Sequence, residues 1–274
     1  MRNKIFAGVA AGAIAAVGVA IPANAISDTT ADLYVLHAVP GLTVDVYVNG
    51  ELTLDDFEPG DLAGPLDLPA DTYTVAITAS DAADDSSPAI GPIDLTLEAN
   101  TSYTAVAHLD ESGDPTASLF TNDLSTVAAG EGRLTVRHTA AAPAVDVLAN
   151  DAVAFENLSN PDEVKADLAV GTISAAVALT GTTDPVIGPA DVEIAEGVNT
   201  IVYAWGSAAD DNLTLAVQTI DGLHSNPGGV DAGTAGLAAD NNNGILVAGL
   251  GGLAALLALA GFAATRLSAA RAAK

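Results

Sequence analysis

The sequence predicts an all-β protein with two tandem β-sandwich domains of immunoglobulin or prealbumin type, followed by one C-terminal transmembrane helix. Two observations predict the sandwiches. Apolar and polar residues alternate along many short segments, as in half-buried strands, and the pattern of residues 31–123 recurs over residues 132–221. The third observation is an uncharged apolar run near the end of the chain, which predicts the helix.

The chain begins with a predicted signal peptide over residues 1–25. Arg2 and Lys4 form the basic start, residues 5–21 form the apolar middle, and Ala23 and Ala25 are the small residues that a signal peptidase reads. We therefore expect an exported protein whose mature chain begins at Ile26.

An internal repeat defines the two predicted domains, 31–123 and 132–221, with a linker at 124–131. Seven residues of the first copy have identical counterparts 101 positions later: Leu33, Val35, His37, Val44, Asp45, Val46 and Asn49. The match continues where "PAIGPIDLTL" from Pro88 meets "PVIGPADVEI" from Pro185. Turn-forming pairs separate the alternating segments: Pro40-Gly41, Asn49-Gly50, Pro59-Gly60 and Glu196-Gly197. Seven or eight short strands in each copy are typical of a two-sheet sandwich.

The C-terminal part predicts a stalk at 222–244, a transmembrane helix at 245–264 and a basic cytoplasmic tail at 265–274. Twenty apolar residues at a rise of ~1.5 Å per residue reach ~30 Å, the thickness of the hydrocarbon core. The tail carries Arg266, Arg271 and Lys274, and basic flanks favour the cytoplasmic side. The expected location is the cell membrane, with a single span and an extracellular ectodomain.

The charge balance excludes nucleic acid as a partner. Between the signal peptide and the tail, only Arg133, Arg137 and Lys165 are basic, against 35 acidic residues in the chain. Such a surface repels nucleic acid and attracts cations or a basic protein partner, although solubility or high salt accounts for it equally well. There is no cysteine, so the domains must be stable through packing alone.

Calcium is the cation that the acidic loops bring into consideration. The weak candidates are Asp81, Asp84 and Asp85 in one loop and Asp110 and Asp114 in another. Neither loop has the spaced oxygen ligands, central glycine and closing glutamate of a helix-loop-helix calcium site. No other metal or cofactor is expected.

A histidine stands eight positions before an aspartate in both copies, as His37 with Asp45 and as His138 with Asp146. We interpret the four residues as a structural repeat motif. A histidine at the end of an apolar strand face more often bonds a carbonyl than a metal, and the loops that follow the two histidines differ, which active-site loops of a shared function would not.

The sequence lacks the motifs of catalysis, including Gly-x-Ser-x-Gly, His-Glu-x-x-His, Ser-x-x-Lys and a phosphate-binding glycine loop. We therefore expect a non-enzymatic cell-surface module for spacing, adhesion or envelope interaction. The alternative is a surface domain that binds cations or an envelope glycan, for which Tyr203 and Trp205 are the aromatic candidates. The oligomeric state is left open.

The segment "HAVPGLTVDVYVNG", with "LYVL" before it and "LPADTYTVAI" after it, resembles the bacterial domain-of-unknown-function family numbered 4397. The resemblance covers about residues 33–221 and is stronger in the first copy, because "HTAAAPAVDVLAND" lacks the Pro-Gly turn and the aromatic of Tyr47. It implies an exported protein with tandem copies and no established activity. "LPADTYTV" also resembles a segment of prealbumin-like surface domains, in agreement with the predicted sandwich.

Overall fold

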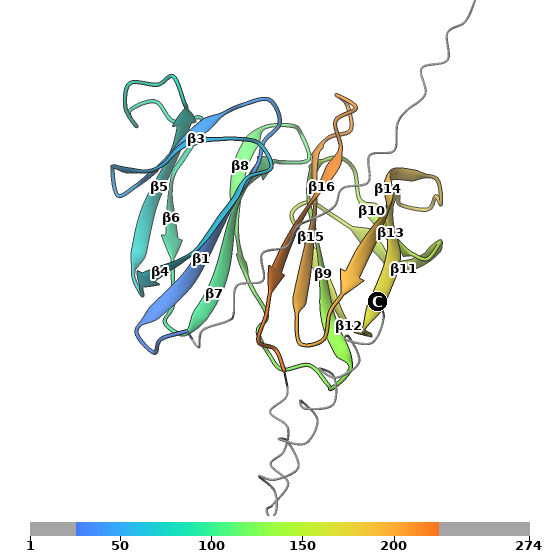
Figure 1. Cartoon of the computed structure of the whole chain (residues 1–274). Coiled ribbons are helices and arrows are strands. Elements are labelled where there is room, and N and C mark those ends of the chain that lie inside the picture. The colour runs from blue at the N-terminus through green and yellow to red at the C-terminus, as the bar shows by residue number, and fades with distance from the viewer. Residues whose placement is uncertain (1–25, 225–274) are drawn as a thin grey trace, which may run out of the picture. The chain divides into compact units, whose positions relative to one another are not determined.

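A computed structural model describes residues 26–224. The chain is all-β over this range, with sixteen strands in four sheets (Figure 1). The part of the chain that the structure describes holds no helix long and apolar enough to span a membrane. The predicted signal peptide, transmembrane helix and basic tail lie outside the described residues, as does the predicted stalk beyond His224.

The first copy consists of two four-stranded sheets. One has the order β4-β1-β7-β8, with β4 at Leu62–Pro69, β1 at Thr30–Ala38, β7 at Thr101–Leu109 and β8 at Pro115–Thr121. The other has the order β3-β2-β5-β6, with β3 at Glu51–Phe57, β2 at Val44–Val48, β5 at Thr72–Ala79 and β6 at Ile90–Thr96. The central strands β1 and β7 are parallel, and the other paired neighbours are antiparallel.

The second copy repeats this topology strand for strand. Its first sheet has the order β12-β9-β15-β16, with β12 at Glu163–Ala169, β9 at Glu131–Ala141, β15 at Asn199–Ser207 and β16 at Thr214–Ile220. Its second sheet has the order β11-β10-β13-β14, with β11 at Ala152–Leu158, β10 at Val145–Ala149, β13 at Gly171–Leu179 and β14 at Pro185–Ile194. Strands β9 and β15 are parallel, as β1 and β7 are.

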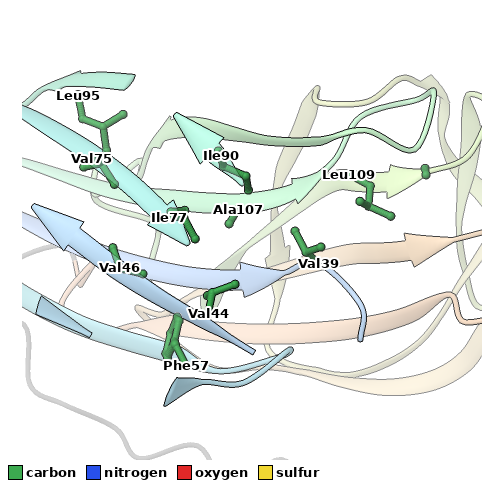
Figure 2. Close-up of a cluster of buried hydrophobic side chains, with 11 residues drawn as sticks. Val39, Val44, Val46, Phe57, Val75, Ile77, Ile90, Leu95, Ala107 and Leu109 are labelled. Atoms are coloured by element: carbon green, nitrogen blue, oxygen red, sulfur yellow. The ribbon is translucent and has the colours of Figure 1, made fainter. Parts of the chain in front are cut away.

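Alternation places one apolar face of each sheet in the interior of its copy. Val44 and Val46 of β2 and Ile77 of β5 are buried in one cluster with Ala107 and Leu109 of β7, which belong to the opposite sheet (Figure 2). Leu134, Val145 and Val177 belong to the corresponding cluster of the second copy. Each copy is therefore a sandwich whose core lies between its two sheets.

The β2–β3 hairpin has the turn that its sequence predicts. Asn49 and Gly50 have φ values of 53° and 79°, and Asn150 and Asp151 of the second copy have 51° and 65°. Positive φ at both central residues is characteristic of the two-residue type I′ turn, which Asn and Gly adopt most readily. The side chain of each Asn adds a bond, because its Oδ1 accepts from the backbone N–H of Thr74 or Ser174.

The two copies contact each other through the outer faces of β4-β1-β7-β8 and β12-β9-β15-β16. One buried cluster contains Leu36, Ala38, Val106 and Phe120 from the first copy and Ile201, Tyr203, Trp205 and Ile220 from the second. These two sheets are therefore buried on both faces. The segment after β16 also packs on the second copy, since Leu223 is buried and its carbonyl accepts from the N–H of Val127.

Candidate functional site

The repeated histidines fasten the loop that follows β1 or β9. His37 Nε2 lies 2.6 Å from the carbonyl oxygen of Leu42, and His138 Nε2 lies 3.2 Å from that of Pro143. Because a carbonyl only accepts, each Nε2 carries the hydrogen. In His138 the other ring nitrogen accepts from the N–H of Ala140 at 3.3 Å. Both rings are 1% exposed, so they hold loops and do not face solvent.

The repeated aspartates hold a bulge in the neighbouring strand. Asp45 Oδ1 accepts from the N–H of Asp56 at 2.9 Å, and Asp146 Oδ1 accepts from the N–H of Asn157 at 2.8 Å. Asp56 and Asn157 have positive φ, and the strand register shifts beside them. A bulge leaves an N–H without a ladder partner, and the buried carboxylate supplies one.

Asp146 makes a second such contact, since its Oδ2 accepts from the N–H of Gly181 at 2.9 Å. These backbone donors lower the pKa of the Asp146 carboxyl, so it remains ionised.

The acidic loop residues do not converge on a common point. Asp81, Asp84 and Asp85 lie between β5 and β6, while Asp110 and Asp114 lie in the β7–β8 hairpin. Two of the carboxylates serve local turns, because Asp110 Oδ1 accepts from the N–H of Ser112 and Asp114, and Asp84 Oδ1 accepts from the N–H of Ser86. Within residues 26–224, the carboxylates that come within 4.8 Å of one another as a group of three belong to Asp45, Asp55 and Asp56.

The two aromatic candidates for glycan binding are covered. Tyr203 is 0% exposed and Trp205 is 9% exposed, and both belong to the apolar cluster between the copies. Gly60 of the first copy lies against the Trp205 ring, close enough that a Cβ there would be 3.5 Å from Cζ2. Neither ring offers a free face on which a sugar could stack, and both serve packing.

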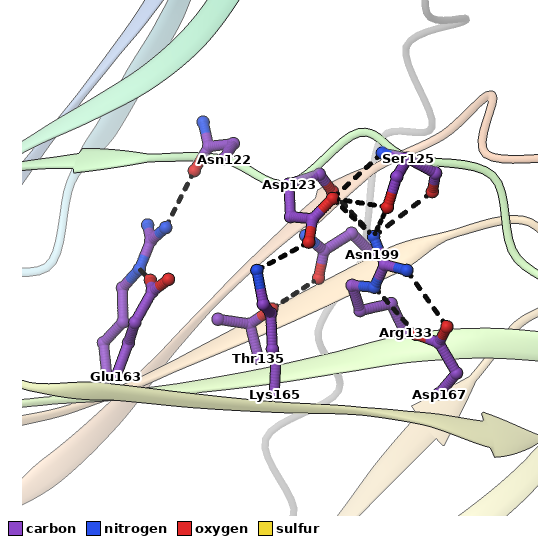
Figure 3. A network of polar contacts seen from close by, with 10 residues as sticks. Asn122, Asp123, Ser125, Arg133, Thr135, Glu163, Lys165, Asp167 and Asn199 are labelled. Carbon is purple, nitrogen blue, oxygen red and sulfur yellow. Dashed lines mark hydrogen bonds and ion pairs between the residues drawn. The ribbon is translucent and has the colours of Figure 1, made fainter.

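The three basic residues of the described chain form one cluster beside the segment that joins the copies. Arg133 pairs with Asp123 at 2.8 Å and with Asp167 at 2.7 Å, and Lys165 pairs with Asp123 at 2.6 Å (Figure 3). Burial acts to raise the pKa of Asp123, but bonds from Lys165 and Ser125 and the charge of Arg133 bring it well below its usual range. Asp123, which follows the last strand of the first copy, is thereby fixed to the second copy.

Arg137 connects the copies at the centre of this contact and is 1% exposed. Its Nε donates to Glu163 at 2.9 Å, its Nη1 donates to the Tyr203 hydroxyl at 2.7 Å, and its Nη2 donates to Asn122 Oδ1 of the first copy at 3.0 Å. The guanidinium carbon also lies 4.5 Å from the centroid of Phe120, at cation–π distance.

A second polar link lies beside Arg137. The Thr104 hydroxyl of the first copy donates to Gln218 Oε1 of the second at 3.1 Å. Gln218 Oε1 also accepts from the Tyr203 hydroxyl at 2.6 Å. The contact thus has specific polar geometry in addition to its apolar cluster.

An apolar cavity of about 260 Å³ lies between the two sheets of the first copy. Aliphatic side chains from both sheets line it, among them Val35, Val46, Leu54, Val75, Ala105 and Ala117. Several of these interior residues are only partly buried, because the cavity opens to solvent. The exposed polar lining residues Asn49, Glu51 and Thr53 are at this opening.

The second copy has almost no corresponding space, with a cavity of about 20 Å³. Three matched positions hold a larger side chain in the second copy. Ala105 pairs with Val35, whereas Val202 pairs with the equivalent Val136; Ala117 pairs with Ala107, whereas Leu215 pairs with Ala204. Phe155 likewise stands opposite Val147 where Leu54 stands opposite Val46. Other lining positions differ in the opposite sense, since Val48 and Val75 of the first copy correspond to Ala149 and Ala175.

An unfilled cavity carries a cost in stability. Apolar cavities lower stability by ~24 cal/mol per Å³, so 260 Å³ corresponds to an upper limit of about 6 kcal/mol for a closed and empty space. The first copy keeps its cavity even though the same scaffold can be filled, as the second copy shows. Scaffold requirements therefore do not explain this cavity. A second space of about 220 Å³ lies between the copies, where Leu36 and Leu62 face Tyr203 and Gln218.

Residues 31–148 match the model of a family described as "Domain of unknown function (DUF4397)". This stretch of the chain is consistent with a DUF4397-like domain. The matched range contains all of the first copy and continues through β9 into β10 of the second. His37, Asp45, His138 and Asp146 all lie within it, whereas Asn157 and Gly181, which donate to Asp146, lie beyond it. No curated protein matches the chain.

The cavity and the contact between the copies were not predicted. Two inward positions of the second copy hold Val202 and Leu215 where the first has Ala105 and Ala117. Other lining positions differ in the opposite sense, since Val75 and Ile77 correspond to Ala175 and Val177, so side-chain volume in the repeat does not mark the cavity. No sequence signal marks the contact either, because Arg133 and Arg137 resemble ordinary surface charges.

Replacing Asp146 with Ala should lower the free energy of unfolding by about 1 to 3 kcal/mol, because two backbone N–H groups lose their acceptor. Asp45→Ala should cost less, since a single such bond is found there. Denaturant unfolding measures both. The exposed Asp191→Ala is the control and should stay within about 0.5 kcal/mol of wild type. Equal values for all three would contradict the bulge-holding role.

Stability should fall as pH falls below about 6.5, the ordinary histidine pKa, because burial lowers the pKa of His37, His108 and His138 in the folded chain. The unfolded chain then binds more protons than the folded one. Each such group adds up to ~1.4 kcal/mol per pH unit to the slope. His37→Gln keeps a donor for Leu42 and should reduce the slope by up to one proton, and His37→Gln/His138→Gln should reduce it further. Urea unfolding between pH 7.5 and 5 measures the slope of the unfolding free energy against pH. Unchanged slopes in the variants would contradict the lowered pKa of the buried histidines.

Proposed function

We propose that this protein is a non-enzymatic, membrane-anchored module of the cell surface, in which two immunoglobulin- or prealbumin-like sandwiches act together as a rigid spacer. The observation that carries the proposal is the buried contact between the copies, centred on Arg137. A flexible pair of domains needs no such contact. A spacer that must hold its far end at a defined distance from the membrane needs such a contact.

The chemistry of the contact supports rigidity over a loose association. A buried guanidinium is stable only when its N–H donors find acceptors. The acceptors of Arg137 come from both copies, since Tyr203 belongs to the second and Asn122 to the first. Separating the copies would remove Asn122 and Phe120 from Arg137 and would expose the apolar cluster. The arrangement therefore favours a single orientation.

The predicted ends of the chain supply the anchor. The signal peptide over 1–25, the span over 245–264 and the tail with Arg266, Arg271 and Lys274 together favour a single-pass protein with its sandwiches outside. The excess of acidic residues keeps such a surface hydrated and favours a basic protein as partner.

Binding of a cation or a glycan has weaker support. The acidic loop residues are engaged in turns, and Tyr203 and Trp205 are covered. A spacer with adhesion or envelope contact through its acidic surface fits these positions better.

Protease added to intact cells should remove the sandwiches from the full chain, detected with an antibody against residues 26–224. Permeabilised cells serve as the control for cleavage. Complete protection of the sandwiches on intact cells would contradict the surface location.

Rigidity can be measured by spin labels, because the chain has no cysteine to compete for labelling. Thr96→Cys in β6 and Glu193→Cys in β14 place exposed labels at equivalent strand positions of the two copies. Pulsed electron–electron double resonance should give one narrow distribution of the distance between the two labels. Arg137→Met should broaden it, whereas the exposed Asp191→Ala should not. A broad wild-type distribution would contradict the spacer.

A further inference from the structure

The cavity of the first copy is suited to an apolar occupant and not to water. A buried water needs two to four polar partners, whereas the interior lining consists of aliphatic side chains such as Val46, Leu54 and Ala105. Its polar residues, Asn49, Glu51 and Thr53, are exposed ones at the opening. An apolar interior with a polar rim matches a molecule that has a hydrocarbon chain and a polar head.

The size of the cavity sets the length of the chain. A dry cavity of ~150 Å³ lined by Leu, Ile and Phe holds one benzene. On that scale, 260 Å³ takes roughly ten non-hydrogen atoms. The occupant is thus a single alkyl chain of medium length or one end of a longer chain.

The charge at the opening selects the head group. Glu51 lies there, and the three basic residues of the described chain are paired elsewhere, with Asp123, Asp167 and Glu163. A carboxylate or phosphate beside Glu51 would be repelled without compensation. A head group without negative charge would be accepted, with Asn49 and Thr53 as polar neighbours.

We propose that the first copy binds the hydrocarbon chain of an amphiphile whose head group carries no negative charge, and that the second copy has no such site. The difference between the copies carries this inference, since the first has a cavity of about 260 Å³ and the second one of about 20 Å³, lined in part by Val202, Leu215 and Phe155. It is independent of the proposed spacer function, which depends on the contact between the copies.

Photolabelling of the full chain in its membrane tests the site without detergent, which would itself compete. The probes are decanol, decylamine and decanoate, each with a diazirine in the alkyl chain, and labelled peptides are mapped by mass spectrometry. Decanol and decylamine should label peptides that carry cavity residues of β2 to β5 and β7, several-fold more than decanoate does. The second copy should stay unlabelled.

Ala105→Val/Ala117→Leu introduces the second copy's own residues and should reduce this labelling at least tenfold while the melting temperature stays equal or rises. Val202→Ala/Leu215→Ala is the matched control and should leave first-copy labelling unchanged. Wild-type labelling that is equal in both copies, or that survives in Ala105→Val/Ala117→Leu, would overturn the proposal.

Glu51→Gln tests the head-group rule without altering the core, and it remains informative if the filled variant does not fold. Decanoate labelling should rise several-fold in Glu51→Gln, and decanol labelling should not change. Decanoate that labels the wild type as strongly as decanol does, with no effect of Glu51→Gln, would show that the cavity does not select a head group and would overturn the assignment.

Discussion

Burial of the Arg137 guanidinium is the constraint on which the arrangement of the two copies depends. A buried charge is costly unless every donor is satisfied and an opposite charge is near. Glu163 and Tyr203 of the second copy supply part of this environment, and Asn122 and Phe120 of the first supply the rest. Neither copy alone provides all of these partners, so the buried guanidinium is fully surrounded only when the two copies are in contact.

The other basic residues strengthen the same contact. Arg133 and Lys165 both pair with Asp123, which immediately precedes the segment between the copies. All the positive charge of the described chain is thus used at one place, while the remaining surface is acidic. Each of the three basic residues of the described range is therefore engaged in an ion pair at or beside the contact.

Duplication has kept the scaffold and changed the interior. The histidine that holds a loop and the aspartate that holds a bulge perform the same bonds in both copies. The core positions have diverged, and the first copy has a cavity of about 260 Å³ where the second has one of about 20 Å³. Constraints set by backbone N–H groups are shared by the copies, whereas interior volume is free to differ between them.

The all-β class, the turn at Asn49-Gly50 and the similarity of the first copy to DUF4397 followed from the sequence, because alternation and turn chemistry are local. The bulge at Asp56 did not, since an unpaired N–H becomes evident only when two strands are aligned. The second buried face of β9 was also not predictable from the sequence. Period-two patterns mark a face by its apolar residues, and this face contains Arg133, Thr135 and Arg137. A polar face that another copy covers resembles a solvated one in sequence.

Differential scanning calorimetry of the full chain, with Arg137→Met as the comparison, shows whether the two sandwiches unfold together. We predict one cooperative transition for the two wild-type sandwiches, with equal calorimetric and van't Hoff enthalpies. Arg137→Met should lower stability by about 1 to 3 kcal/mol, because Tyr203 and Asn122 lose a buried hydrogen-bond partner, and should separate the transition into two. Two independent transitions in the wild type, unchanged by Arg137→Met, would contradict the claim that this buried guanidinium joins the copies.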